Sequence, residues 1–135
     1  EFELHHTPAN LSLGRLYASS SDRDAGQTAD KAFDGDPGTH WQAGSGSPFS
    51  GEWLEGDFGA NVTFNQAVLS EYGERRSGYR IEYWNGSSWQ TAYTGTTIGA
   101  SHTATFPAVT GSKARLYFTS GTYAPIIYEF AIHKT

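Results

Sequence analysis

Two carboxylates and a hydroxyl lie within one short stretch of the sequence, KAFDGDPGTHW, which runs from Lys31 to Trp41. Asp34 and Asp36 flank a glycine, and Thr39 follows shortly after. Three interpretations are open: an ordinary solvated turn, a pair of catalytic acids, or a cage for a hard cation. Calcium binds six to eight oxygens of carboxylates, hydroxyls and backbone carbonyls, and the glycine lets carbonyls turn inward. Because Asp-Gly and Pro-Gly are common turn formers, the stretch alone is weak evidence for a cation.

A distant carboxylate strengthens the cation interpretation. Glu129 lies near the end of the chain within the apolar run IIYEFAI, Ile126 to Ile132. A carboxylate in such a run is expected to be partly buried, and an unpaired buried charge is costly. Glu129 therefore needs a cation, which is either an arginine or a metal ion.

Catalytic chemistry has little support in the sequence. Asp34 and Asp36 are too close in sequence for the opposed roles of two glycosidase carboxylates, unless the turn holds them apart. The sequence contains no G-x-S-x-G, H-E-x-x-H or phosphate-loop motif. We therefore expect a protein that is not an enzyme.

Composition narrows the class of protein. The 135 residues suit one domain, and a formal charge of −5 without a basic run argues against a nucleic-acid partner. The longest apolar runs fall far short of the roughly 20 residues that span a bilayer. The chain has no cysteine, 16 glycines and 15% aromatic residues. This balance favours short strands joined by tight turns.

The hydrophobic pattern has a period of two, which indicates strands with one buried face. Tyr79, Ile81 and Tyr83 alternate with polar residues, and Leu116 and Phe118 do the same. The sequence predicts an all-β fold with one helical turn at 28 to 33. Turn signals recur roughly every ten residues, which favours a β-sandwich. The expected strands lie near 52 to 58, 62 to 71, 78 to 84, 88 to 94, 101 to 106, 113 to 119 and 125 to 133.

Long polar, glycine-rich segments at Ser19 to Gln27 and Ala43 to Gly51 are either binding loops or tolerated surface loops. Residues 1 to 8 are interpreted as an N-terminal tail derived from cloning, and residues 9 to 135 as a single module.

Several motifs follow one another in a characteristic order along the chain. They are NLSLG (10 to 14), AFDGDPGTHW (32 to 41), EWLEGDFG (52 to 59), YRIEYWNGSSW (79 to 89), TGTTIG (94 to 99), FPAVTGSKARLYF (106 to 118) and IYEFAI (127 to 132). With these motifs the sequence resembles the discoidin, or coagulation factor C-type (F5/8 type C), domain, and among bacterial sequences it is most similar to family 32 carbohydrate-binding modules, including those attached to α-L-fucosidases. The resemblance implies a jelly-roll β-sandwich.

The resemblance also implies a structural Ca²⁺ at the acidic turn. Side chains of Asp34, Asp36 and Glu129 and the hydroxyl and carbonyl of Thr39 match ligands of the family, and two backbone carbonyls complete the set. The implied metal residues are Lys31, Asp34, Asp36, Thr39, Tyr128 and Glu129.

Sugar recognition is expected in loops at the same end of the sandwich, because similar modules bind there. An aromatic platform covers the C–H face of a sugar ring, and planar or charged polar groups bind its hydroxyls. Asp22 and Arg23 are further candidates of the polar kind. The expected sugar-binding residues are Glu71, Tyr72, Glu74, Arg75, Arg76, Tyr123, Gln42, Phe49 and His40.

The implied function is that of a noncatalytic carbohydrate-binding module that binds terminal sugar units. We expect a monomeric module within a secreted glycoside hydrolase or polysaccharide lyase, with carbohydrate as partner, no nucleic acid and no membrane. A discoidin-type lipid-binding or protein-binding domain is the alternative, with Phe49 as the one obvious apolar residue for it. Galactose-binding members often carry a histidine where this chain has Gln42, which argues against simple galactose specificity.

Overall fold

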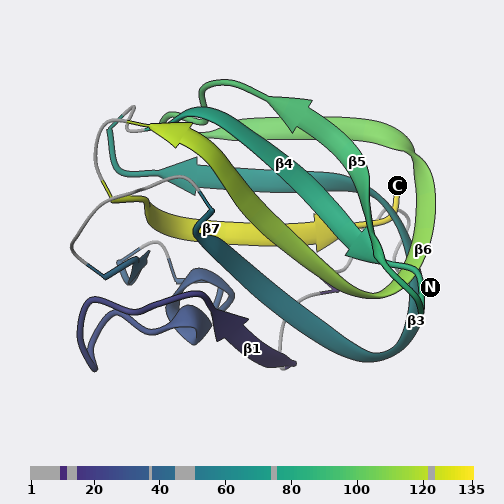
Figure 1. Ribbon diagram of the computed structural model, residues 1–135, viewed down its shortest axis with the longest axis horizontal. Helices are drawn as coiled ribbons and strands as arrows, with labels where there is room; N and C mark the ends of the chain where they lie inside the picture. Colours follow the sequence, from purple (N-terminus) through teal and green to yellow (C-terminus); the bar gives the residue numbers. More distant parts are fainter. Residues whose placement is uncertain (1–9, 12–14, 37, 45–50, 74–75, 122–123) are drawn as a thin grey trace, which may run out of the picture.

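The computed structural model describes residues 10–11, 15–36, 38–44, 51–73, 76–121 and 124–135. Strands dominate these residues, and the order of elements is β1, η1, β2, β3, β4, β5, β6 and β7 (Figure 1). No helix among them is long and apolar enough to cross a membrane. The bounds are β1 Leu16–Ser19, η1 Ala29–Ala32, β2 Trp41–Gln42, β3 Trp53–Glu71, β4 Arg76–Trp84, β5 Trp89–Gly95, β6 His102–Gly121 and β7 Ile126–His133.

Two long strands build both layers of the sandwich. β3 and β6 pair antiparallel from Trp53 opposite Tyr117 to Leu69 opposite His102, with register shifts where the pair bends (Figure 1). In one layer β1 lies beside the first half of β3, followed by the second half of β6, β4 and β5. In the other, β2 and β7 continue the second half of β3 and the first half of β6. The predicted all-β jelly-roll sandwich is confirmed.

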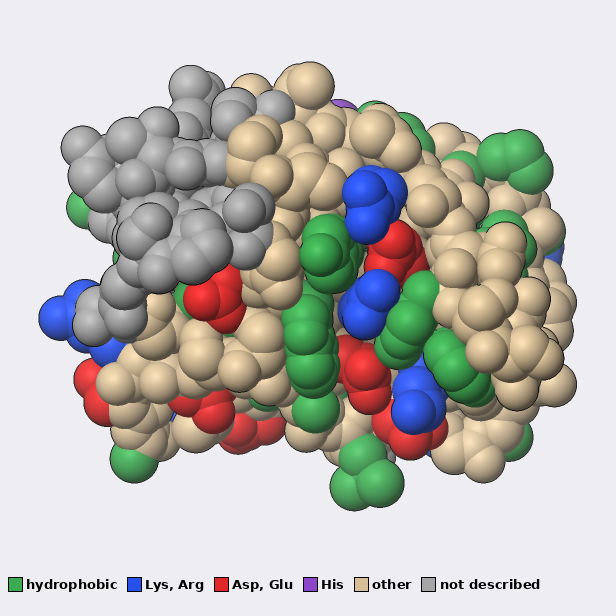
Figure 2. Space-filling model, in the orientation of Figure 1, with side chains coloured by type: hydrophobic (Ala, Val, Ile, Leu, Met, Phe, Trp, Pro, Cys, Tyr) green, Lys and Arg blue, Asp and Glu red, His purple; other side chains and the backbone are tan. Residues whose placement is uncertain are grey.

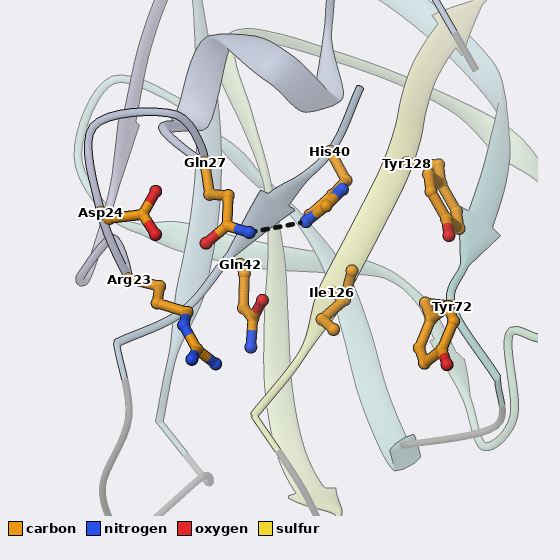
Figure 3. A pocket seen from close by; sticks show the side chains of 8 residues that line it. All are labelled: Arg23, Asp24, Gln27, His40, Gln42, Tyr72, Ile126 and Tyr128. Atoms are coloured by element: carbon orange, nitrogen blue, oxygen red, sulfur yellow. Dashed lines mark hydrogen bonds between the residues drawn. The ribbon is translucent and has the colours of Figure 1, made fainter. Parts of the chain in front are cut away.

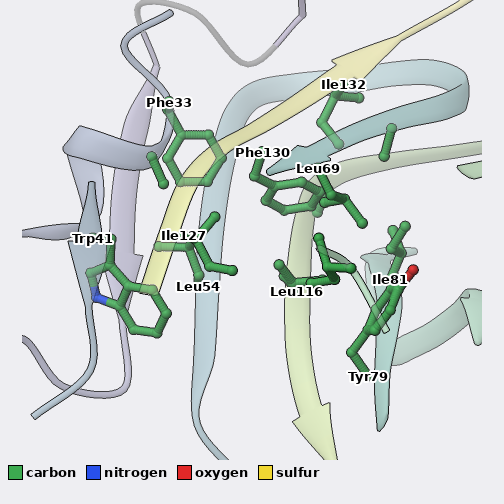
Figure 4. Packing of buried hydrophobic residues seen from close by; sticks show 14 of the residues in the cluster. Phe33, Trp41, Leu54, Leu69, Tyr79, Ile81, Leu116, Ile127, Phe130 and Ile132 are labelled. Atoms are coloured by element: carbon green, nitrogen blue, oxygen red, sulfur yellow. The ribbon is translucent and has the colours of Figure 1, made fainter. Parts of the chain in front are cut away.

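The core lies between the two layers. Leu54 and Leu116 from one layer and Leu69 and Phe130 from the other are all fully buried (Figure 4). Their positions follow the period of two, because alternate residues of a strand point to the same face. This apolar contact positions the loops at the ends of the strands.

The predicted boundaries of three strands and of the helical turn are confirmed. β4, β5 and β7 begin and end within two residues of the predicted ranges, and the predicted helical turn is η1. Two predicted breaks are wrong: the ranges 52 to 58 and 62 to 71 form the single strand β3, and the ranges 101 to 106 and 113 to 119 form the single strand β6. Gly111 lies in β6 and is required by close packing, because a Cβ there would lie 2.5 Å from the carbonyl oxygen of Trp84. The short strands β1 and β2 were not predicted.

The close approach at Gly111 gives a testable consequence. Gly111→Ala is expected to lower the free energy of unfolding by about 2 kcal/mol, because the added methyl forces the backbones of β4 and β6 apart. Chemical denaturation measures this loss. Gly26→Ala is the matched control, since a Cβ there meets its nearest neighbour at an ordinary 3.5 Å. Equal stability of the two variants would contradict the packing role.

The outer face of the β4 and β6 layer carries charged and aromatic side chains that contact one another (Figure 2). Arg115 Nε donates to Glu82 Oε1 at 2.6 Å, and Arg80 Nε donates to Glu82 Oε2 at 2.8 Å. The Arg115 guanidinium also lies 4.2 Å from the ring centre of Trp89 and 5.0 Å from that of Tyr117. Glu82, predicted on the polar face, is therefore only 5% exposed.

The two ends of the module meet. Leu11 N donates to Ile132 O at 2.7 Å, and Ile132 N donates to the Asn10 side chain at 3.2 Å. The segment just after the predicted tail is thus bonded to the last strand. The tail itself, residues 1 to 8, lies outside the described residues.

Candidate functional site

The acidic turn follows η1 and is anchored by an aromatic side chain. Phe33 is 1% exposed, and its ring stacks on that of Tyr17 with the centres 4.4 Å apart. The chain then reverses through Gly35 at a φ of 73°, a value that glycine adopts readily. Asp36 N donates to Asp34 Oδ1 at 3.0 Å, and Gly38 N donates to Asp36 Oδ1 at 2.8 Å. These bonds hold both carboxylates over the turn.

Oxygen atoms crowd around the hydroxyl of Thr39. Its Oγ1 lies 2.5 Å from Asp34 Oδ2, 3.1 Å from the Asp36 carbonyl oxygen and 3.3 Å from the Lys31 carbonyl oxygen. A hydroxyl has a single proton to donate, so it satisfies only one of these acceptors fully. The oxygens of Lys31, Asp34 and Asp36 thus lie around the Thr39 hydroxyl, which has only one hydrogen to share among them. Such a set suits a hard cation.

Glu129 reaches the same turn from β7. Its Oε2 accepts from Gly35 N at 3.3 Å, whereas its buried Oε1 has no hydrogen-bond partner among the described residues. Burial, and then the charges of Asp34 and Asp36, raise the pKa of Glu129 to about 7, against the lowering effect of the Gly35 hydrogen bond. A carboxyl whose folded-state pKa is raised favours folding when protonated, so the ion-free protein loses this stability as pH rises from the usual carboxyl range through 7. A bound cation would remove this cost.

The oxygen donors of the turn are mixed in kind. No three His, Cys, Asp or Glu side chains of the described residues make a compact metal cluster. The convergent set instead combines carboxylates with a hydroxyl and carbonyls, the mixture that calcium accepts. The predicted metal residues Lys31, Asp34, Asp36, Thr39 and Glu129 are brought together here. Tyr128 was predicted to contribute its backbone carbonyl, which stays a prediction, and its side chain lines a neighbouring pocket.

That pocket has a volume of about 440 Å³ and opens beside the acidic turn (Figure 3). It is formed where the segment from Arg23 to Gln27, the entry to β2, the start of β7 and the end of β3 meet. The lining residues are Arg23, Asp24, Gln27, His40, Gln42, Tyr72, Ile126 and Tyr128.

The two sides of the pocket differ in chemistry (Figure 3). Tyr72, which is 52% exposed, meets Tyr128 edge to face with ring centres 6.5 Å apart, and His40 meets Tyr128 at 5.7 Å. The opposite side carries an amide, a guanidinium and a carboxylate from Gln27, Arg23 and Asp24. Aromatic rings beside convergent polar groups are what recognition of a sugar ring needs.

Backbone bonds and one buried indole position the polar side. Arg23 N donates to Gln42 O at 2.9 Å, and Gln42 N donates to Gln27 O at 3.3 Å, which fastens the loop along β2. The fully buried Trp41 donates from Nε1 to Ser21 O at 3.1 Å and to the Asp22 carboxylate at 3.0 Å. Asp22 is thereby committed to holding this loop.

The turn and the pocket lie on opposite sides of shared backbone. Thr39 belongs to the turn while the next residue, His40, lines the pocket. Glu129 likewise reaches the turn while Tyr128 lines the pocket, as alternation along a strand requires. Two consecutive residue pairs thus connect the two features directly.

The structure brings together part of the predicted sugar-binding set. His40, Gln42 and Tyr72 line the pocket with Arg23. Glu71 is a correction: it is 2% exposed, and its Oε1 accepts from Gly99 N at 3.4 Å, because it shares the buried face of β3 with Leu69. Phe49, Glu74, Arg75 and Tyr123 lie outside the described residues, as does the side chain of Arg76.

Four lining residues were not predicted as sugar contacts: Asp24, Gln27, Ile126 and Tyr128. Asp24 and Gln27 do lie in the polar segment that the sequence marked as a candidate loop. For Tyr128, strand alternation could have predicted the pocket, since its neighbour Glu129 was assigned to the turn and adjacent residues point to opposite sides. For Ile126, no feature of the sequence predicted a place in the pocket.

Comparison with solved structures finds close relatives in fold. Chitosan-binding module 1 derived from the chitosanase/glucanase of Paenibacillus sp. IK-5 is 33% identical, with a TM-score of 0.84 over 96% of this chain and 99% of that one. Module 2 of the same enzyme, solved in complex with chitotriose, is 30% identical, with a TM-score of 0.84 over 92% of this chain and 99% of that one.

A more distant match shows the fold alone. A putative α-L-fucosidase from Bacteroides thetaiotaomicron is 21% identical with a TM-score of 0.86, and the match covers 94% of this chain but 29% of the fucosidase. Comparison with curated protein sequences gave no match.

The family profile described as F5/8 type C domain matches residues 16 to 130, which include the acidic turn and almost all of the described pocket and strands. The chain is therefore a member of the F5/8 type C domain family.

Proposed function

We propose that this protein is a noncatalytic carbohydrate-binding module whose ligand site is the pocket between Tyr72, His40 and Arg23. The observation that carries the proposal is the pairing of an aromatic side with convergent polar groups at one end of a sandwich. Support comes from the chitosan-binding modules that share its fold at 30% to 33% identity. Asp34 and Asp36 accept hydrogen bonds from backbone amides of their own turn, so neither is placed as the acid or base of a hydrolase.

The preferred ligand is a saccharide of glucosamine units. A module of similar fold was solved with chitotriose, and the pocket offers Asp24 as a counter-ion for a protonated amine. Amide groups of Gln27 and Gln42 suit sugar hydroxyls. The open pocket is small and favours short or terminal stretches of a chain, so we expect weak binding, with Kd on the order of 0.1 to 1 mM.

Removing the aromatic side tests the site. Tyr72→Ala is expected to weaken binding of a glucosamine trimer about tenfold in isothermal titration calorimetry, because it removes a ring surface worth roughly 1 to 1.5 kcal/mol. Leu16→Ala is the matched control, since Leu16 is the other large hydrophobic side chain exposed in the described residues.

The probe set separates the ligand classes. Titrations with glucosamine, N-acetylglucosamine and glucose trimers and with galactose should rank the glucosamine trimer first. Asp24→Asn should remove that preference while binding of the neutral trimers persists. Unchanged binding by Tyr72→Ala would reject the pocket, and hydrolysis of any trimer by the purified chain would reject the noncatalytic role.

We further propose that the acidic turn binds a structural calcium ion. Asp34, Asp36, Thr39, Glu129 and the Lys31 carbonyl would hold it, and the ion would neutralise the carboxylates that crowd there. The proposal rests on the crowded oxygens and on Glu129 Oε1, which is buried without a hydrogen-bond partner in the described part of the chain. In this role the ion stabilises the scaffold and takes no part in chemistry.

The biological setting follows from the same comparison. The relatives derive from a chitosanase/glucanase, and the fucosidase match covers 29% of its chain. We propose that this module belongs to a secreted glycan-degrading enzyme and holds it at its substrate. Tethering of this kind raises the local concentration of substrate without new contacts in the catalytic site.

A further inference from the structure

A second hollow of about 410 Å³ lies on the outer face of the β4 and β6 layer, lined by Gly51, Arg80, Tyr117 and Thr119. It shares no lining residue with the Tyr72 pocket. Gly51 forms part of its edge, and a Cβ there would lie 3.8 Å from the Tyr117 hydroxyl. The absence of a side chain at Gly51 therefore leaves the Tyr117 hydroxyl accessible from this side.

Hydrogen-bonding groups in this hollow have no partner in the described part of the chain. Arg80, whose side chain is 36% exposed, donates from Nε to Glu82, but no described residue accepts from its terminal nitrogens. The hydroxyls of Tyr117 and Thr119 likewise make no hydrogen bond with any described residue. The guanidinium lies 4.7 Å from the Tyr117 ring centre, and both side chains line the hollow.

The charge in the hollow is positive. Arg80 is the one charged residue among those lining it. Glu82 lies beneath at 5% exposure and is shared with Arg115. The nearby Glu52 accepts from the hydroxyls of Ser20 and Ser21 and is occupied there. A planar guanidinium whose terminal nitrogens have no acceptor among the described residues matches a carboxylate, and adjacent hydroxyls match neutral hydroxyl groups.

We propose that this hollow is a second saccharide site, specific for a sugar that carries a carboxylate, such as a hexuronic acid. Arg80 binds the carboxylate, and Tyr117 and Thr119 bind ring hydroxyls. The volume lies in the range of small-molecule sites, and the open face gives millimolar affinity. The module then has two sites with different ligand classes on different faces.

Amide NMR titrations of the whole chain test this assignment. D-glucuronate should shift the amide signals of Gly51, Gly78 and Thr119, with a Kd in the millimolar range, and D-glucose should bind at least tenfold more weakly there. Sodium sulfate that binds as well as glucuronate would overturn the saccharide assignment and leave a simple anion site. Glucuronate shifts confined to the Tyr72 pocket, or no shifts, would also overturn it.

Variants that keep the Arg80 to Glu82 ion pair separate binding from folding. Tyr117→Phe with Thr119→Val removes both hydroxyls and should weaken glucuronate at least fivefold, with the spectrum otherwise unchanged. Thr110→Val, whose hydroxyl bonds to Thr63 at the far bend, is the matched control and should bind normally. Tyr72→Ala should also bind glucuronate normally. Equal affinity of the double variant and the control would reject the proposal.

Discussion

Replacing Glu82 with glutamine is expected to lower the free energy of unfolding by about 3 kcal/mol, because one buried carboxylate neutralises two guanidinium groups. Arg115 has a side chain that is only 17% exposed, so water replaces the lost charge poorly. Glutamine keeps the shape of the side chain, and urea denaturation then reports the loss of charge instead of the loss of volume.

The control for Glu82 is a carboxylate in the same row of residues across β4, β6 and β3. Glu55 lies opposite Arg115 on β3, in the same row, and is more exposed. Burial raises the pKa of Glu55, so folding disfavours its ionised form and the charge adds no stability of its own. Glu55→Gln should therefore change the free energy of unfolding by less than about 1 kcal/mol. A loss for Glu82→Gln no larger than that for Glu55→Gln would show that the aromatic stacking of Arg115, and not the shared carboxylate, holds this face together.

Adding calcium to chelated protein is expected to raise the free energy of unfolding by about 2.7 kcal/mol at a free concentration 100-fold above Kd. For a domain of this size the melting temperature should rise by about 10 °C. The reason is electrostatic, since the ion joins carboxylates from the turn and from β7 that otherwise repel one another. Differential scanning calorimetry with and without a chelator measures the shift.

Single variants identify the atoms behind the calcium effect. Glu129→Gln should remove most of the calcium-dependent shift while stabilising the chelated protein, because it also removes the buried charge. Asp30→Asn is the control: this carboxylate lies in η1, bonds to Thr28 and stands outside the crowded oxygens. A calcium-dependent shift that survives Glu129→Gln intact, or that is absent from the parent protein, would rule out the proposed ion site.

Alternation made most of the fold predictable. Leu116 and Phe118 repeat on one face, and the structure buries both completely. The two-residue strand β2 has no room for such a pattern, and β1 exposes Leu16 at 74%, so neither strand stood out from loop sequence. The period of two correctly placed Glu82 on the outer face of its strand. It did not predict that Glu82 is buried there, because arginines and aromatic rings cover that face.

The acidic turn was predictable for a different reason than the pocket. Its oxygens come from residues close in sequence, plus one carboxylate whose burial the apolar run of β7 predicted. The pocket takes its sides from four segments that only the folded sandwich brings together. Glu71 shows the limit: it lies two residues after Leu69, and β3 continues far enough to bury it.

The passage of β3 and β6 through both layers has a consequence for how the module unfolds. The two layers share their central strands, since β3, with 19 residues, and β6, with 20, each pass through both layers. One layer therefore cannot melt while the other persists, and the transition should be cooperative. The pairing of Trp53 with Tyr117 spans a long stretch of chain, so folding should be slow, on a scale of milliseconds to seconds.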